Sequence, residues 1–151
     1  MNSLALDLSA SNKELNPAIF GDIASFCAYI DQNLGPKIGV GGYLEHRVIY
    51  EAHENFATAS ADFRNIHLGI DFWTAAGTPV NAVADGVVHS FQVNPGSGNY
   101  GPTIILHHPA LGIYSLYGHL ASTDLEGLSE GMPISEAVSY THLTLPTNRE
   151  V

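Results

Sequence analysis

The sequence contains few cations and a single cysteine. Among its 151 residues, Lys and Arg together number 5 against 15 Asp and Glu, so the formal net charge is −10. This balance argues against a nucleic-acid partner and against binding to an anionic membrane surface. Cys27 is alone, which excludes an intramolecular disulfide framework, and we expect it to be a small buried hydrophobe.

Long apolar runs are also missing. The first ten residues carry neither a cationic stretch nor a long apolar stretch, so we expect no signal peptide in this sequence. No segment is apolar over the length that a membrane span requires. The cellular location stays unknown, because an incomplete N-terminus or export with a partner would be compatible with the same residues.

The first part of the chain predicts one helix in an otherwise irregular segment. Residues 1–16 are polar and irregular. Pro17–Asn33 has apolar residues at helical spacing after a candidate N-cap, Asn16, and Gly35-Pro36 ends the pattern. We therefore expect residues 1–63 to form a helical and irregular appendage to the main domain.

Polar residues before position 64 carry no clear chemical motif. The glycines of Gly39–Tyr43 fit no phosphate loop, since no lysine follows them. We expect Val48–Tyr50 to be a short strand. The surrounding run of His46, Arg47, Glu51, His53 and Glu54 is interpreted as a solvated loop.

From His67 onward the pattern predicts strands. The expected strands are Val80–Ala84, Val87–Val93, Thr103–His108 and Ile113–Leu120. Asp85-Gly86 is typical of a hairpin turn, and the glycine-rich residues 94–102 predict a long loop. Short strands with tight connections indicate antiparallel pairing in a sandwich or a curled sheet.

The segment Arg64–Trp73 combines a strand pattern with possible metal ligands. Apolar residues at every second position, from Ile66 to Phe72, predict one buried face. His67 and Asp71 share the other face, and both residue types bind zinc. In a straight strand they would be about 13 Å apart. Gly69 between them permits a bend, so we expect a bent strand.

A second histidine occurs at the end of an apolar and aromatic strand. His119 is either half-buried and bonded to a neighbour, or delivered to the face that carries His67 and Asp71. His107-His108 on the preceding strand is interpreted as the entry to a turn.

Four motifs in order and spacing carry a resemblance: His67–Asp71, Gly77–Val80, Asp85–Val88 and Tyr117–Leu120. They resemble the lysostaphin/LytM-like zinc metalloendopeptidases of peptidase family M-23, over about residues 64–134. The resemblance implies a mainly β fold, an antiparallel sandwich of the duplicated-hybrid-motif type with a zinc cleft. It also implies a peptide substrate, often a peptidoglycan cross-link, and a periplasmic or secreted location for many members.

The resemblance assigns roles to three residues of this sequence. The first motif supplies two zinc ligands, which correspond to His67 and Asp71. The Y-x-H-L motif supplies a catalytic histidine, which corresponds to His119. The implied cofactor is Zn²⁺, and the implied partner is a peptide or peptidoglycan substrate.

A later H-x-H motif, which supplies the third zinc ligand in the family, is missing here. Residues 137–151 do not look like a core strand pair and resemble a translated adapter read-through. We expect the native sequence to stop near Glu136, so that residues 64–136 are an incomplete metallopeptidase core and the tail is non-native. Two ligands hold zinc weakly, and the chain as written is expected to be inactive.

Other functions remain open at this point. A degenerate, non-catalytic member of the same fold would act as a binding or regulatory module. A zinc enzyme with a different substrate is equally compatible with the fold and the metal. A lipoyl-type module is set aside because it needs a lysine at a hairpin tip, and Lys13 and Lys37 are the only lysines.

Overall fold

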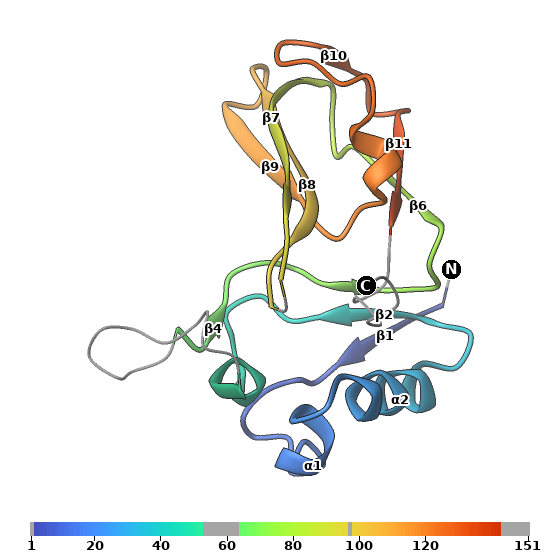
Figure 1. Cartoon of the computed structure of the whole chain (residues 1–151), viewed down its shortest axis with the longest axis vertical. Coiled ribbons are helices and arrows are strands. Elements are labelled where there is room, and N and C mark those ends of the chain that lie inside the picture. The colour runs from blue at the N-terminus through green and yellow to red at the C-terminus, as the bar shows by residue number, and fades with distance from the viewer. Residues whose placement is uncertain (1, 53–63, 97, 143–151) are drawn as a thin grey trace. The chain divides into compact units, whose positions relative to one another are not determined.

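The computed structural model describes residues 2–52, 64–96 and 98–142, and the chain divides into two compact units (Figure 1). The first unit runs to Thr74 and the second begins at Ala75. The expected boundary between residues 63 and 64 borders a range outside the described residues, so that division stays a prediction. The mainly β fold with antiparallel sheets is confirmed.

The first unit is built on a three-stranded sheet. β1 (Ser3–Leu6) pairs in parallel with β2 (Ile38–Gly41), and β5 (Phe72–Trp73) pairs antiparallel with β2 on its other edge. The expectation that residues 1–16 are irregular is therefore wrong for β1. Leucine recurs at every second position from 4 to 8, and the last two of these leucines are buried.

Two helices replace the single expected one. α1 (Pro17–Phe20) and α2 (Ile23–Leu34) are separated because Asp22 is extended and accepts a hydrogen bond from Ser25 N at 2.8 Å. α2 buries an apolar stripe formed by Phe26, Ile30 and Leu34. No helix in the described ranges is long and apolar enough to cross a membrane.

The segment before the second unit is less regular than the alternation predicted. β3 (Glu45–His46) pairs antiparallel with β4 (Ile66–His67), and the expected strand at 48–50 is a 3₁₀ helix, η1 (Val48–Ala52). The expected buried face is exposed: Ile66, Leu68, Ile70 and Phe72 are each at least 45% exposed. β4 and β5 pair in different sheets, so one face does not persist across the bend between them.

The second unit holds a four-stranded antiparallel sheet in the order β10-β7-β8-β9. Its strands are β7 (Gly86–Asn94), β8 (Gly101–His108), β9 (Ile113–Tyr117) and β10 (Pro133–Ile134). The predicted strand that contains His119 ends earlier, at Tyr117. A short 3₁₀ helix, η3 (Ser122–Leu125), packs near β7 and β8.

The predicted hairpin at Asp85-Gly86 is wrong. β6 (Thr78–Asn81) pairs with β11 (Ser139–His142), whereas β7 pairs with β8 and β10. The glycine signal has a different cause, close approach of the backbones. A Cβ on Gly86 would lie 2.5 Å from the carbonyl oxygen of His107.

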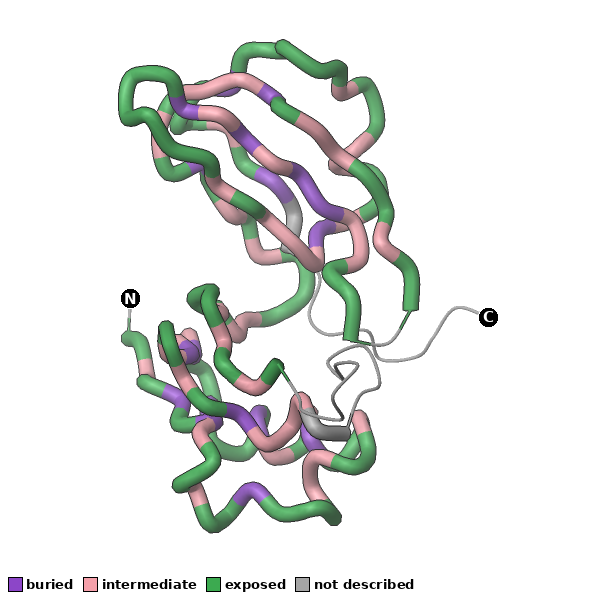
Figure 2. Tube along the Cα trace, turned by 90° about the vertical axis from the view of Figure 1, so that its left-hand side faces the viewer, coloured by how far each residue is buried: buried purple, intermediate pink, exposed green. Residues whose placement is uncertain are grey.

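Each unit has its own buried residues (Figure 2). The core of the second unit consists of apolar side chains from its strands and loops: Ala82, Val88, Ile104, Leu106, Leu120, Ile134 and Tyr140. Tyr140 belongs to β11, inside the segment that did not look like a core strand. That structural expectation is wrong, since the register with β6 buries the tyrosine ring. The non-native origin of the tail stays a prediction.

Candidate metal centre

The bend around Gly69 brings His67 and Asp71 into contact. His67 Nε2 lies 3.3 Å from Asp71 Oδ1, although a straight strand would separate the two residues by about 13 Å. A Cβ at Gly69 would lie 3.1 Å from His67 Nε2, a distance shorter than most contacts that Cβ atoms make in proteins. The glycine therefore leaves room for the imidazole ring between the ends of the bend.

The His67 ring is oriented by its other nitrogen. Nδ1 lies 3.1 Å from the carbonyl oxygen of Gly42, which accepts a hydrogen bond from the protonated nitrogen. This contact directs Nε2 toward Asp71 and fixes the tautomer that metal-binding histidines commonly adopt. The hydrogen bond to Asp71 raises the pKa of His67, against the opposing effect of partial burial.

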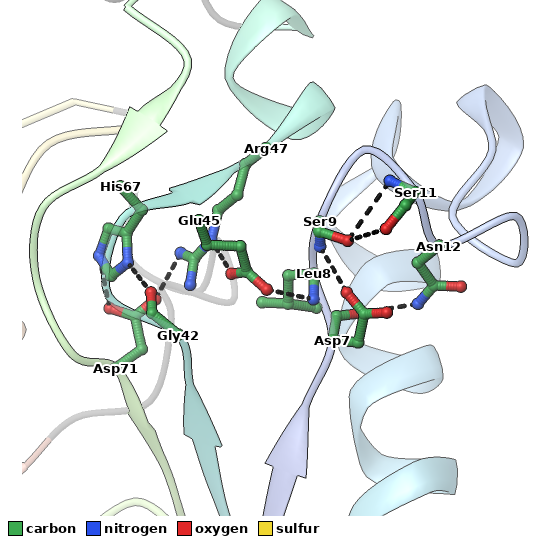
Figure 3. A network of polar contacts seen from close by, with 10 residues as sticks. All are labelled: Asp7, Leu8, Ser9, Ser11, Asn12, Gly42, Glu45, Arg47, His67 and Asp71. Carbon is green, nitrogen blue, oxygen red and sulfur yellow. Dashed lines mark hydrogen bonds and ion pairs between the residues drawn. The ribbon is translucent and has the colours of Figure 1, made fainter.

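The Asp71 carboxylate lies between the Arg47 guanidinium and the His67 imidazole (Figure 3). Its Oδ2 accepts a hydrogen bond from Arg47 Nη1 at 2.5 Å, and its Oδ1 faces His67. Burial alone would raise the pKa of Asp71, but the His67 hydrogen bond and the Arg47 charge lower it from 3.8 to about 2. The carboxylate is therefore ionised over the physiological pH range.

Arg47 is buried, with 4% of its side chain exposed. Its Nε donates to Glu45 Oε2 at 2.6 Å, and Glu45 Oε1 accepts the backbone N–H of Leu8 at 2.9 Å. The interpretation of Arg47 as part of a solvated loop is therefore wrong. Glu45 and Arg47 are two residues apart, a spacing that places both side chains on one face of extended chain, and this signal was missed.

The distance between the two predicted ligand atoms is compatible with a shared zinc ion, and their role as ligands stays a prediction. Two zinc bonds of about 2.1 Å at a tetrahedral angle place their donor atoms about 3.4 Å apart. The observed separation of His67 Nε2 and Asp71 Oδ1 is 3.3 Å, and Nδ1 is already bound to a carbonyl group. Within the described part of the chain, no group of three or more His, Cys, Asp or Glu could hold a metal.

His119 belongs to the second unit, whereas His67 and Asp71 belong to the first. Its backbone is left-handed, with φ of 56°, and its N–H donates to the carbonyl of Tyr100 at 2.6 Å. The half-buried imidazole lies 6.5 Å from the Tyr100 ring, centroid to centroid. Convergence of His119 with the two ligands therefore stays a prediction.

The other histidines of the second unit have structural surroundings. His108 is fully buried, with Nδ1 3.0 Å from the carbonyl oxygen of Asp85 and Nε2 2.7 Å from Ser115 Oγ. His107 stacks on Tyr114 at 4.6 Å. The pair ends β8, and the His108 carbonyl accepts the backbone N–H of Leu111 at 3.0 Å in the turn that follows, so the interpretation of the pair as the entry to a turn is confirmed.

Comparison with known proteins identifies a matching family and relatives of this chain. Residues 65–138 match the model of peptidase family M23. A "DD-carboxypeptidase/endopeptidase Mpg" of Neisseria meningitidis serogroup B is 42% identical over 77 residues, which are 50% of this chain and 17% of that protein. A protein of the same name from Neisseria gonorrhoeae is 42% identical over 57 residues, 38% of this chain and 12% of the relative. No solved structure matches significantly.

Proposed function

The chain belongs to peptidase family M23 through residues 65–138, and from this we propose a zinc-dependent metalloendopeptidase function for the protein that contains it. In this proposal His67 and Asp71 bind the metal, and His119 is the catalytic histidine. The observation that carries it is the 3.3 Å separation of His67 Nε2 and Asp71 Oδ1, with Nδ1 bound to Gly42.

The chemistry of each side chain suits this role. A bound zinc would polarise the scissile carbonyl and lower the pKa of a water molecule toward neutrality. His67 offers a directed nitrogen, and Asp71 offers an ionised oxygen that reduces the net charge of the site. His119 either takes a proton from the attacking water or donates a hydrogen bond to the developing oxyanion.

The proposed substrate is a peptide bond in a peptidoglycan cross-link. The Neisseria relatives carry the words "DD-carboxypeptidase/endopeptidase" in their names, and the segment that matches the peptidase family contains both His67 and Asp71. The aligned segment is 17% of the first relative, so the substrate of the whole protein is part of the proposal. The net charge of −10 presents no obstacle to a glycine-rich peptide.

A second candidate function is a non-catalytic binding or regulatory module of the same fold. It is favoured by the two-ligand centre, since the described residues offer no third His, Cys, Asp or Glu beside His67 and Asp71. The presence of His67, Asp71 and His119 opposes it, because a degenerate copy needs none of them. Because the described residues offer no third ligand, we also propose that this chain alone has little or no peptidase activity.

Zinc titration of the purified chain, combined with a peptidoglycan-release assay, tests both functions. We expect zinc binding that His67→Ala and Asp71→Ala each weaken by at least tenfold, whereas His119→Ala leaves zinc affinity unchanged. Zinc binding that is indifferent to His67→Ala and Asp71→Ala would contradict the metal centre. Rapid release of peptides by the wild-type chain, lost in His119→Ala, would support the catalytic role and overturn the proposed inactivity.

A further inference from the structure

We propose that Arg47 is a positioning residue for the metal ligand Asp71, and that Glu45 neutralises its charge so that a cation can still bind. The inference rests on the proposed metal centre. It extends the centre to the N-terminal part of the chain, which lies outside the segment that matches the peptidase family.

The contacts divide the Asp71 carboxylate into two functional halves. Arg47 Nη1 donates to Oδ2 at 2.5 Å, and Oδ1 faces His67 Nε2 at 3.3 Å. A hydrogen bond to one oxygen stops rotation of the carboxylate and leaves the other oxygen directed at the imidazole (Figure 3). Ligating carboxylates commonly depend on such hydrogen bonds from residues that do not touch the metal.

The position of Arg47 is itself tightly determined. Its side chain is 4% exposed, and Nη2 is buried without a hydrogen-bond partner among the described residues. A Cβ on Gly41 would lie 2.8 Å from Nη2 and 3.2 Å from Asp71 Cβ, so the guanidinium occupies the space beside this glycine. The backbone N–H of Gly41 also donates to the carbonyl of Asp71 at 2.8 Å, which fixes the main chain of the ligand.

Glu45 resolves an electrostatic conflict. A buried, unpaired arginine beside a metal-binding carboxylate would repel a cation. Glu45 Oε2 accepts from Arg47 Nε at 2.6 Å and is itself 10% exposed, so the two charges offset one another. The Asp71 carboxylate then keeps its negative charge for the metal.

Glu45 in turn depends on the N-terminal segment. Its second oxygen accepts the backbone N–H of Leu8 at 2.9 Å, and the Leu8 side chain is 1% exposed. A continuous set of contacts therefore runs from Leu8 through Glu45 and Arg47 to Asp71. This assigns residues before the family segment a role in support of the ligand.

Competition between the full chain and a chromophoric chelator for zinc alone tests the inference. We expect Arg47→Met to weaken zinc binding by about 10- to 100-fold, and Arg47→Lys and Glu45→Gln to weaken it by less. Lys37→Met is the matched control, because it removes the same charge from an exposed position without a contact to the centre. Cobalt absorption spectra of each variant report ligand geometry, which a purely structural role would leave unchanged. Circular dichroism without metal identifies misfolded variants, and if Arg47→Met is misfolded the other two substitutions carry the test.

The sign of the effect decides between positioning and repulsion. If Arg47 only repels cations or competes for Asp71, Arg47→Met will tighten zinc binding, and the inference is overturned. Unchanged affinity and an unchanged cobalt spectrum also overturn it, provided that His67→Ala abolishes binding in the same assay. A wild-type chain without His67-dependent zinc binding removes the metal centre itself, and the inference falls with it.

Discussion

The two ring nitrogens of His67 meet different requirements. Nδ1 lies 3.1 Å from the Gly42 carbonyl oxygen, whereas Nε2 faces the Asp71 carboxylate and would bind the metal of the proposed centre. Without metal, a proton on Nε2 strengthens the contact with Asp71. With metal, that proton has to leave, since zinc binds the neutral imidazole.

The pH dependence of the metal-free chain follows from these two groups. The pKa of Asp71 is lowered from 3.8 to about 2, so its contribution is present above pH 3.8 and disappears as pH falls through 2. The pKa of His67 is raised above 6.5, so its contribution is present below pH 6.5 and disappears as pH rises through the raised value. We expect maximal stability of the first unit between about pH 4 and pH 6.5.

Urea unfolding in the presence of a chelator measures this profile. Trp73 is the single tryptophan and belongs to the first unit, so its fluorescence reports that unit. His67→Ala is expected to abolish the decrease in stability at high pH. If the pH profile of His67→Ala is the same as that of the wild-type chain, the decrease in stability at high pH is not caused by His67. Zinc affinity of the wild-type chain should rise over the pH range in which metal-free stability falls.

Gly41 and Gly42 offer a second test at the scale of single residues. A Cβ at Gly41 would lie 2.8 Å from Arg47 Nη2, whereas a Cβ at Gly42 would meet only ordinary contacts of 3.6 Å or more. We expect Gly41→Ala to destabilise the first unit by about 1–3 kcal/mol, because a buried guanidinium has little freedom to move. Gly42→Ala is the matched control, and equal losses of stability from the two substitutions in Trp73-monitored unfolding would rule out this packing.

Among the elements, β11 has the greatest consequence for the interpretation of the C-terminal residues. Ser139–His142 pairs with Thr78–Asn81 and places Tyr140 in the core, with 4% of the residue exposed. The Tyr140 hydroxyl is buried and lacks a hydrogen-bond partner within the described ranges, and burial raises its pKa. The ring therefore stabilises the unit while the hydroxyl group opposes burial.

Two substitutions separate these contributions. Tyr140→Ala is expected to lower the free energy of unfolding by about 3–5 kcal/mol through loss of a buried aromatic ring. Tyr140→Phe should leave stability unchanged or raise it, because it removes a buried polar group without a partner. Tyr114, 58% exposed in the same unit, provides the control, and its replacement by Ala should cost about 1 kcal/mol or less. If Tyr140→Ala is as mild as the control, β11 does not pack as the structure shows.

At the scale of the whole molecule, the family segment and the compact units do not coincide. The match to peptidase family M23 covers residues 65–138, whereas the chain divides between Thr74 and Ala75. The motif with His67 and Asp71 therefore lies with the N-terminal residues, and the motif with His119 lies with the four-stranded sheet.

Local sequence patterns were sufficient to predict part of the fold and part of the candidate site. Period-two patterns located β7 and β8 to within a few residues, and Gly69 indicated the bend that joins His67 to Asp71. The same alternation failed at Ile66–Phe72, because the segment divides between two sheets. Charged residues near Arg47 resembled a solvated loop, since nothing within that run reveals a partner 24 residues away.

By itself, the sequence determined the strand-rich character of the chain, the bend at Gly69 and the order of the four peptidase motifs, all of which depend on residues close together along the chain. Only the tertiary structure decided which strand β6 pairs with, that Tyr140 is buried, and that Arg47 binds Glu45 and Asp71. These contacts join distant segments, and their free energy depends on burial and charge compensation that arise only when the chain has folded.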